Sequence, residues 1–266
     1  MKRKASPVKT RTASTDPRLF FILFILVFLA LIFSGCTAAR TQVTEYRNPE
    51  ELYKVAMEGY LDRRYADAEK DFKKLMELFP MSSQARDVEL LLGDVCYAME
   101  KYDESGSYYA SFVAMRPAHP MADYALFQKG MSHFRDVLTP DRDQTSTRKA
   151  LFAFEDLVRD YPGSPYYEKS VELISFLKRR LAERQFYIGH FYYKMKNYKA
   201  ALSRFRDVLR DYPEDGPTDQ TLYYIGESYR RLGEDSLAED AYTTIIKDYP
   251  ESPYMQDARK RLNGYL

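Results

Sequence analysis

The stretch Asp160-Tyr161-Pro162-Gly163-Ser164-Pro165-Tyr166 returns almost unchanged as Asp248-Tyr249-Pro250-Glu251-Ser252-Pro253-Tyr254, and Asp211-Tyr212-Pro213 repeats its first part. Proline lacks an N–H and disfavours helical geometry in the residue before it, so the stretch predicts that a helix ends near Tyr161. Serine is a good N-cap and proline suits the first helical position, so a new helix is expected to begin at Ser164 and Pro165. The recurrence of this boundary indicates a repeated unit of two helices.

Prolines that end helices recur along the whole chain, with spacings of 37, 45, 51 and 37 residues, at Pro80, Pro117, Pro162, Pro213 and Pro250. Similar small and aromatic residues precede four of them: Ala68 and Phe72, Ala150 and Phe154, Gly189, Tyr192, Ala201 and Phe205, and Gly226, Tyr229, Ala238 and Tyr242. The pattern resembles the tetratricopeptide repeat, in which small residues let two antiparallel helices approach and an aromatic ring fills the space beside them.

The body of the chain is predicted to be all-α, because apolar residues recur every three or four positions from Pro49 onward without strand-like alternation. We expect a superhelical solenoid of five tetratricopeptide-like helix pairs with a C-terminal capping helix. Extra length predicts a polar loop at residues 138–147, and a first helix of about 28 residues, or roughly 42 Å, in the fourth pair. The pairs are expected at residues 49–79, 82–115, 120–161, 165–212 and 217–249, and the cap at 253–263.

Stacked helix pairs form a groove lined by the first helix of each pair. The positions expected to face this groove in the first three pairs are mostly aromatic, and tyrosine offers a large, stiff, amphipathic contact surface that suits an extended peptide. The alternative is that many of these side chains only fill gaps between helices. The predicted groove residues are Tyr53, Met57, Tyr60, Leu90, Asp94, Tyr97, Tyr124, Phe127, Phe134 and Arg135.

Composition and charge argue against several other classes of protein. Six of the 40 Lys and Arg and one of the 39 Asp and Glu lie in the first 35 residues, so the remainder has a small acidic excess. Nucleic-acid binding requires a surplus of Lys and Arg, so no nucleic-acid partner is expected. The three histidines lack partners at metal-ligand spacing, Cys96 is expected to pack in a core, and no catalytic motif is present. We therefore expect neither an enzyme nor a metal site.

The N-terminus has the layout of an export signal. A basic arm precedes fifteen consecutive apolar residues, 19–33, which is short for a membrane span of about 20 residues. Ser34-Gly35-Cys36 follows and resembles the lipobox of bacterial lipoproteins, in which the cysteine is lipidated, although Phe33 stands where leucine is usual. The sequence therefore predicts a signal peptide at residues 1–35, lipid attachment at Cys36 and a polar tether at residues 36–48.

Two other readings of the leader remain open: an uncleaved anchor in the inner membrane, and cleavage of the signal without lipidation. The lipobox resemblance also implies a destination, because an aspartate directly after the cysteine retains many lipoproteins in the inner membrane, and Thr37 stands there instead. The implied location is the periplasmic face of the outer membrane. Several acyl chains would make that attachment stable.

A more specific resemblance begins with Pro117-Ala118-His119-Pro120-Met121-Ala122-Asp123-Tyr124-Ala125-Leu126-Phe127-Gln128-Lys129-Gly130. It continues through Leu157-Val158-Arg159-Asp160-Tyr161-Pro162 and Leu177-Lys178-Arg179-Arg180-Leu181-Ala182. These stretches contain motifs that lie outside the tetratricopeptide consensus. These stretches are similar to the third and later repeats of the BamD family of outer-membrane-protein assembly lipoproteins. The likeness covers nearly all of the mature chain and is weaker in the first two repeats.

The resemblance implies a non-enzymatic subunit of the machine that inserts β-barrel proteins into the outer membrane. Its implied partners are a BamA-like insertase, unfolded β-barrel proteins and outer-membrane lipid, and other Bam lipoproteins stay open; no cofactor is implied beyond the lipid on Cys36. The front half, residues 49–163, would receive the aromatic C-terminal strand of substrates. The rear half, residues 164–266, would dock the insertase, with Arg204 near that contact.

One competing function remains. A periplasmic coordinator of the Tol-Pal or cell-wall type also carries tetratricopeptide repeats with Tyr-Pro-x-Ser turns. Proteins of that type generally have an N-terminal coiled coil and no lipobox, whereas this sequence has Ser34-Gly35-Cys36 in that region.

Overall fold

The computed structural model describes residues 48–264. The predicted signal peptide, Cys36 and nearly all of the tether lie outside the described residues, and those expectations remain predictions. Within the described residues, no helix combines the length and apolar character needed to cross a membrane.

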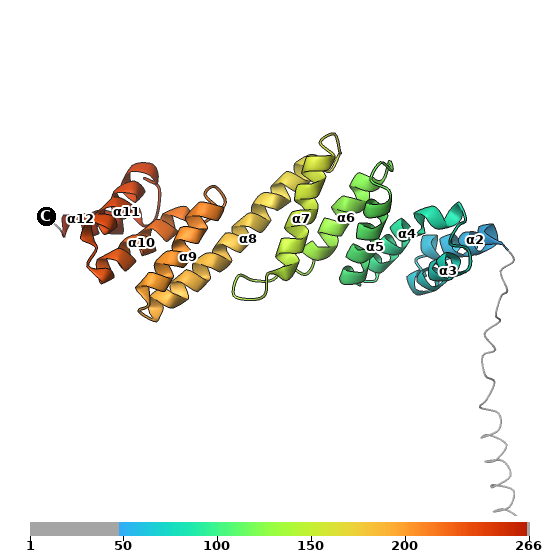
Figure 1. Ribbon diagram of the computed structural model, residues 1–266, viewed down its shortest axis with the longest axis horizontal. Coiled ribbons are helices and arrows are strands. Elements are labelled where there is room, and N and C mark those ends of the chain that lie inside the picture. The colour runs from blue at the N-terminus through green and yellow to red at the C-terminus, as the bar shows by residue number, and fades with distance from the viewer. Residues whose placement is uncertain (1–47, 265–266) are drawn as a thin grey trace, which may run out of the picture. The chain divides into compact units, whose positions relative to one another are not determined.

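The described residues form helices joined by turns and loops, which confirms the all-α prediction (Figure 1). Consecutive helices pack side by side as five antiparallel pairs, and the last helix, α12, packs on α11 as the expected cap. The helices are α2 (Pro49–Leu61), α3 (Tyr65–Leu78), η1 (Gln84–Asp87), α4 (Val88–Ala98), α5 (Tyr102–Met115), α6 (Ala122–Phe134), α7 (Thr145–Asp160), α8 (Tyr167–Lys194), α9 (Tyr198–Asp211), α10 (Thr218–Leu232), α11 (Asp235–Asp248) and α12 (Met255–Asn263).

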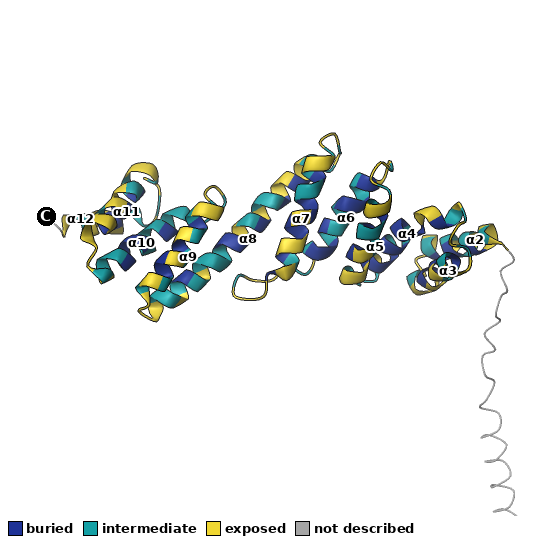
Figure 2. Ribbon diagram, viewed as in Figure 1, coloured by how far each residue is buried: buried dark blue, intermediate teal, exposed yellow. Residues whose placement is uncertain are grey.

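The core is divided into clusters that lie within and between successive pairs, and buried residues face the neighbouring helices (Figure 2). Each cluster contains an aromatic ring from the second helix of a pair. Three examples, all fully buried, are Phe72, Phe154 and Phe205. Small residues make room for these rings. The pattern of small and aromatic residues in the sequence therefore predicted the packing correctly.

Helix α8 is 28 residues long, as predicted, and lies between α7 and α9 (Figure 1). Its first half packs on α7 through Leu173 and Leu177, while Phe186 in its second half packs with the cluster around Phe205. The long loop of the third pair is also present, but its predicted end was wrong. Helix α7 begins at Thr145 rather than after residue 147, because Gln144 is buried and accepts a hydrogen bond from the Thr147 hydroxyl at 2.7 Å.

The repeated Asp-Tyr-Pro stretch ends α7 as expected, but its serine does not cap the next helix. The Ser164 hydroxyl donates to Asp123 Oδ2 of α6 at 2.8 Å and accepts the Tyr166 N–H at 3.1 Å, and α8 begins only at Tyr167. The second copy repeats this geometry, since the Ser252 hydroxyl donates to Asp219 of α10 at 2.6 Å. The stretch therefore ties each new helix to the first turn of the preceding pair.

Candidate functional site

Three of the predicted groove residues, Tyr60, Asp94 and Tyr124, meet at the half-buried carboxylate of Asp94. Asp94 of α4 accepts hydrogen bonds on Oδ1 from the hydroxyls of Tyr109 at 2.6 Å and Tyr124 at 2.7 Å. The hydroxyl of Tyr60 approaches the same carboxylate from α2. Helices α2, α4, α5 and α6, which belong to the first three pairs, thus place polar groups at one point.

Burial dominates the electrostatics of this point. It raises the pKa of Asp94 above its ordinary value, although the hydrogen bonds from Tyr109, Tyr124 and Tyr60 act in the opposite direction. Burial and the charge of Asp94 also raise the pKa of Tyr109 and Tyr124, so both phenols remain protonated and act as hydrogen-bond donors.

Aromatic rings extend the arrangement toward α8. The ring of Tyr124 lies 6.1 Å from that of Tyr166, which stacks on Phe127 with a centroid distance of 4.7 Å and an angle of 18°. Tyr124, Phe127 and Tyr166 are all half-buried, so part of each ring still faces solvent. Aromatic surface of this kind supplies contact area at low conformational cost to a bound peptide.

Tyr97 lies on α4 about one helical turn after Asp94, and the guanidinium group of Arg135 contacts its side chain. The Arg135 Nε donates to the Tyr97 hydroxyl at 2.8 Å, and its guanidinium carbon lies 5.6 Å from the centre of the Tyr97 ring. Arg135 is itself exposed. We call the residues described so far the front aromatic cluster: Tyr60, Asp94, Tyr97, Tyr109, Tyr124, Phe127, Arg135 and Tyr166.

Two predicted groove residues have other principal contacts. Tyr53 packs against Phe72 inside the first pair at 6.3 Å, and Phe134 packs against Phe176 of α8 at 5.5 Å. Both contacts fit the alternative in which aromatic side chains fill gaps between helices. Of the remaining predictions, Met57 packs against the core of the first pair, and Leu90 is buried in the core beside Tyr109.

Sequence reasoning missed Tyr109 and Tyr166 as members of the cluster. Tyr166 is the last residue of the repeated Asp-Tyr-Pro stretch, which was interpreted only as a boundary between two helices. Tyr109 occupies the aromatic position of a second helix, where the repeat pattern assigns a ring to the core. Its hydroxyl was the available signal, because a buried phenol requires a hydrogen-bond partner.

The rear half contains Arg204 and an aromatic cluster of its own. Arg204 lies on α9, where its side chain is 43% exposed and its guanidinium lies 3.9 Å from Asp207, a loose ion pair. His190 is within 4.7 Å of the Tyr224 ring and stacks with Phe186 at 5.8 Å, so the histidine packs among rings. Burial lowers the pKa of His190, with a further contribution from Lys194.

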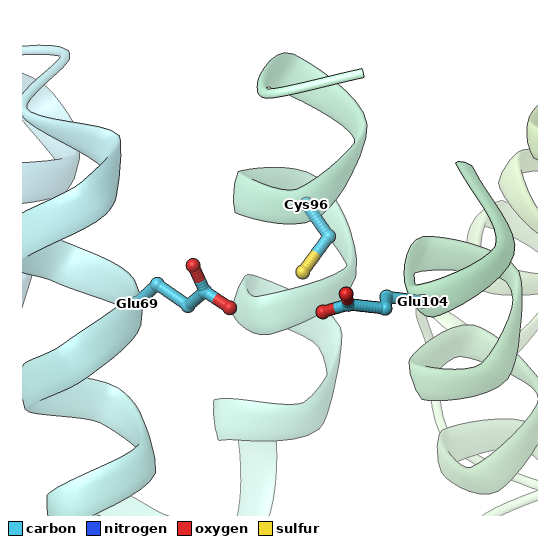
Figure 3. Close-up of side chains that lie close together, drawn as sticks. All are labelled: Glu69, Cys96 and Glu104. Carbon is cyan, nitrogen blue, oxygen red and sulfur yellow. The ribbon is translucent and has the colours of Figure 1, made fainter. Parts of the chain in front are cut away.

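A second cluster of titratable side chains joins α3, α4 and α5. Figure 3 shows the Cys96 sulfur between the carboxylates of Glu69 and Glu104, close enough together to hold a metal ion. The two Glu69 oxygens, however, accept hydrogen bonds from Lys73 at 2.6 Å and Lys101 at 2.8 Å. Burial, followed by the charges of both glutamates, raises the pKa of Cys96 to about 11.

A metal ion would therefore have to displace two ammonium groups from Glu69 and deprotonate a thiol with a raised pKa. The geometry fits an ion-pair network that joins neighbouring pairs better than it fits a set of metal ligands. Cys96 is fully buried, which confirms its expected role in core packing.

Comparison with known proteins assigns the chain to a family. The family model described as outer membrane lipoprotein, YfiO, matches residues 45–243, a range that includes the front aromatic cluster and Arg204. The chain belongs to the YfiO family of outer membrane lipoproteins.

Curated relatives agree with this family assignment. The outer membrane protein assembly factor BamD of Caulobacter vibrioides is 29% identical over 201 residues, which are 74% of this chain and 66% of that protein. The BamD of Neisseria gonorrhoeae is 28% identical over 218 residues, covering 75% of this chain and 80% of that protein. The YfiO family is thus one of outer membrane protein assembly factors, which confirms the resemblance found in the sequence.

A tetratricopeptide repeat protein of Thermus thermophilus, TTC0263, is similar in structure, with 15% identity, coverage of 81% of this chain and 99% of that chain, and a TM-score of 0.35. A TM-score of 0.35 is too low to support a conclusion about the fold or function of this chain. The assignment of helix pairs rests on the packing of α2 to α12 described above.

Proposed function

We propose that this chain assembles β-barrel proteins into the outer membrane as a non-enzymatic scaffold and peptide receptor. Membership of the YfiO family supports the assembly role, and relatives of this family are named assembly factors rather than enzymes. The front aromatic cluster supports the receptor role and is the observation that carries it. Its half-buried rings around Asp94 and beside Arg135 offer both apolar and polar contacts to an extended strand.

The strand we propose as ligand is the C-terminal segment of an unfolded β-barrel protein, ending in an aromatic residue. An aromatic side chain can pack on the exposed parts of Phe127 and Tyr166, which already stack on each other. The exposed guanidinium of Arg135 is suited to the terminal carboxylate, because arginine binds carboxylates through paired hydrogen bonds.

The rear half is proposed to dock a BamA-like insertase through a surface that includes Arg204. This arginine is available for a new partner because its contact with Asp207 is long, at 3.9 Å. Arg210 on the same helix differs: it pairs with Asp207 at 2.9 Å and with Asp211 at 2.7 Å. A scaffold that holds a substrate at one end and the insertase at the other raises their effective concentration toward each other.

Lipid on Cys36 is proposed to hold the chain at the periplasmic face of the outer membrane. This proposal rests on the lipobox-like Ser34-Gly35-Cys36 and on the description of the family as outer membrane lipoproteins. Replacing Cys36 by Ala should abolish acyl labelling and shift the protein out of the outer-membrane fraction. Unchanged labelling and fractionation would contradict the anchor.

The scaffold proposal is tested by co-purification from detergent-solubilised membranes. Wild-type protein should capture a BamA-like insertase, and Arg204→Glu should lose most of that capture. Arg210→Glu is the matched control, because it makes the same change of charge on the same helix and should retain capture. Equal loss in both variants would indicate a general charge effect, and capture unchanged by Arg204→Glu would place the interface elsewhere.

A further inference from the structure

In two helix pairs of this chain, the residue that directly follows the glycine of the first helix is acidic, whereas the corresponding residue of the other pairs is not. In the second pair the Tyr109 hydroxyl donates to Asp94 at 2.6 Å, and in the fifth pair the Tyr242 hydroxyl donates to Glu227 at 2.8 Å. Each acid directly follows the glycine on which the tyrosine ring packs. In the third and fourth pairs the ring is a phenylalanine and the residue after the glycine is not acidic: Phe154 with Met131, and Phe205 with His190.

The rear acid is neutralised by the chain itself. Glu227 accepts from Arg261 Nε of the cap helix at 2.7 Å and pairs with Arg230 at 3.1 Å. Burial alone would raise the pKa of Glu227, but the hydrogen bonds from Tyr242 and Arg230 and the charges of Arg230 and Arg261 lower it below its ordinary value. Glu227 therefore stays ionised within a complete ion-pair network.

The front acid has no such partner. Among residues 48–264, no Lys, Arg or His forms an ion pair with Asp94, whose hydrogen-bond partners are tyrosine hydroxyls. Neutral phenols satisfy the lone pairs of a carboxylate without cancelling its charge. Withdrawing a carboxylate even partly from water without a counter-charge is costly, and this cost appears as the raised pKa of Asp94.

The surroundings of Asp94 are those of a site for a cation. A carboxylate supplies charge-assisted hydrogen bonds to an ammonium or guanidinium group, and the faces of tyrosine rings attract cations. The chain already contains one such cation–ring contact, about one helical turn from Asp94 on α4. The guanidinium carbon of Arg135 lies 5.6 Å from the centre of the Tyr97 ring. Half-buried Asp94, Tyr60 and Tyr124 remain partly open to solvent, so a group from outside can reach them.

We propose that Asp94 is the counter-charge for a Lys or Arg side chain carried by the peptide segment that docks on the front aromatic cluster. This inference rests on the proposed receptor function and specifies its ligand: an aromatic-ended segment with a cationic side chain. Arg261 performs the corresponding task for Glu227 from within the chain. In the front half, the incoming substrate completes the pair.

The test uses the full-length protein in detergent and fluorescent ten-residue peptides that end in phenylalanine. One series carries a single lysine at successive positions, and a matched series carries norleucine, which has similar length and no charge. Binding is measured by anisotropy at low and high salt. At one position the lysine peptide should bind the wild-type protein about tenfold more tightly than its norleucine match, and this preference should shrink with salt.

Asp94→Asn should reduce that tenfold preference to less than about twofold while leaving the norleucine peptide unaffected, because only the charge interaction is lost. Glu227→Gln is the matched control and should retain the preference. The salt dependence of the wild-type protein tests the inference even if the Asp94 variant does not fold.

Three results would overturn the inference. Equal loss of both peptides in Asp94→Asn would show that Asp94 only positions the tyrosines. Equal binding of both series by the wild-type protein would remove the cation from the proposal and leave the receptor function intact. A wild-type protein that binds none of the peptides would contradict the receptor function and the inference together.

Discussion

At the scale of single residues, packing is tightest where a glycine of a first helix meets the aromatic ring of its partner. A Cβ built on Gly130 would lie 2.5 Å from Phe154 Cε1, closer than real Cβ contacts allow. Phe154 is fully buried and cannot move aside. Gly130→Ala should therefore lower the free energy of unfolding by about 1–3 kcal/mol, as overpacked cores do, in urea titrations followed by circular dichroism.

Gly163→Ala is the control for this prediction. No atom lies within 4 Å of a Cβ built on Gly163, in the loop before α8. Its stability should stay within about 0.5 kcal/mol of the wild-type value. If Gly130→Ala proved as stable as Gly163→Ala, the close packing of the third pair would be contradicted.

The stability contributions of half-buried Asp94 and buried Glu227 should respond to pH with opposite signs. The raised pKa of Asp94 means that the folded state holds this proton more tightly than the unfolded chain, so wild-type stability relative to Asp94→Asn should increase as pH falls through the folded pKa. The lowered pKa of Glu227 means the reverse: its contribution is present above the ordinary glutamate pKa of about 4.3 and is lost as pH falls through the folded value.

Urea unfolding of the wild-type protein, Asp94→Asn and Glu227→Gln between pH 3.5 and pH 8 measures both slopes. The stability difference between wild type and Asp94→Asn should fall as pH rises, and the difference between wild type and Glu227→Gln should rise. Slopes of the same sign would show that both carboxylates lie in equivalent environments. That result would contradict the proposed difference between Asp94, which has tyrosine partners, and Glu227, which has arginine partners.

At the scale of elements, α8 couples the front and rear pairs through one continuous backbone. Leu177 packs in the core cluster shared with α7, and Phe186 packs in the core cluster of the fourth pair. The helical segment between these two residues therefore joins the two clusters. Glu183→Pro would remove a backbone hydrogen bond within this segment and clash with the preceding turn, at a cost of about 3 kcal/mol or more. We expect the single urea transition to broaden or split, because repeats unfold together only while their junctions are intact.

Glu183→Ala controls for the loss of the side chain, which forms an ion pair with Arg180 at 3.1 Å. Surface pairs of this kind contribute about 0–1 kcal/mol, so this variant should keep one sharp transition. A sharp transition in Glu183→Pro as well would contradict the role of α8 as the connection between the two halves.

The elements also show where sequence reasoning succeeds and where it stops. Helix pairs, the cap and the length of α8 were predictable because proline and the three-to-four periodicity act locally along the chain. The role of Ser164 was not, because its partner Asp123 is 41 residues away and only the fold brings them together. The same limit explains Tyr109, whose hydroxyl finds Asp94 across a helix pair.

At the scale of the whole molecule, six of the ten predicted groove residues lie in the front aromatic cluster, and the other four, Tyr53, Met57, Leu90 and Phe134, have their principal contacts elsewhere. The sequence could indicate a row of aromatic residues on first helices, because the repeat assigns them positions. It could not indicate which carboxylate lacks a counter-charge, since that depends on Arg261 reaching Glu227 and on no cation reaching Asp94 within residues 48–264. The division into a front half for substrates and a rear half for the insertase remains a prediction.

Photo-crosslinking in living cells tests the receptor claim most directly. Crosslinking residues at Tyr60, Tyr97 and Phe127 should capture the C-terminal segment of a β-barrel protein during its assembly. Phe152 on α7, which is 60% exposed, and the exposed Ser107 on α5 serve as control positions and should capture little. Capture of that segment as strongly from Phe152 and Ser107 as from the front aromatic cluster would contradict the account.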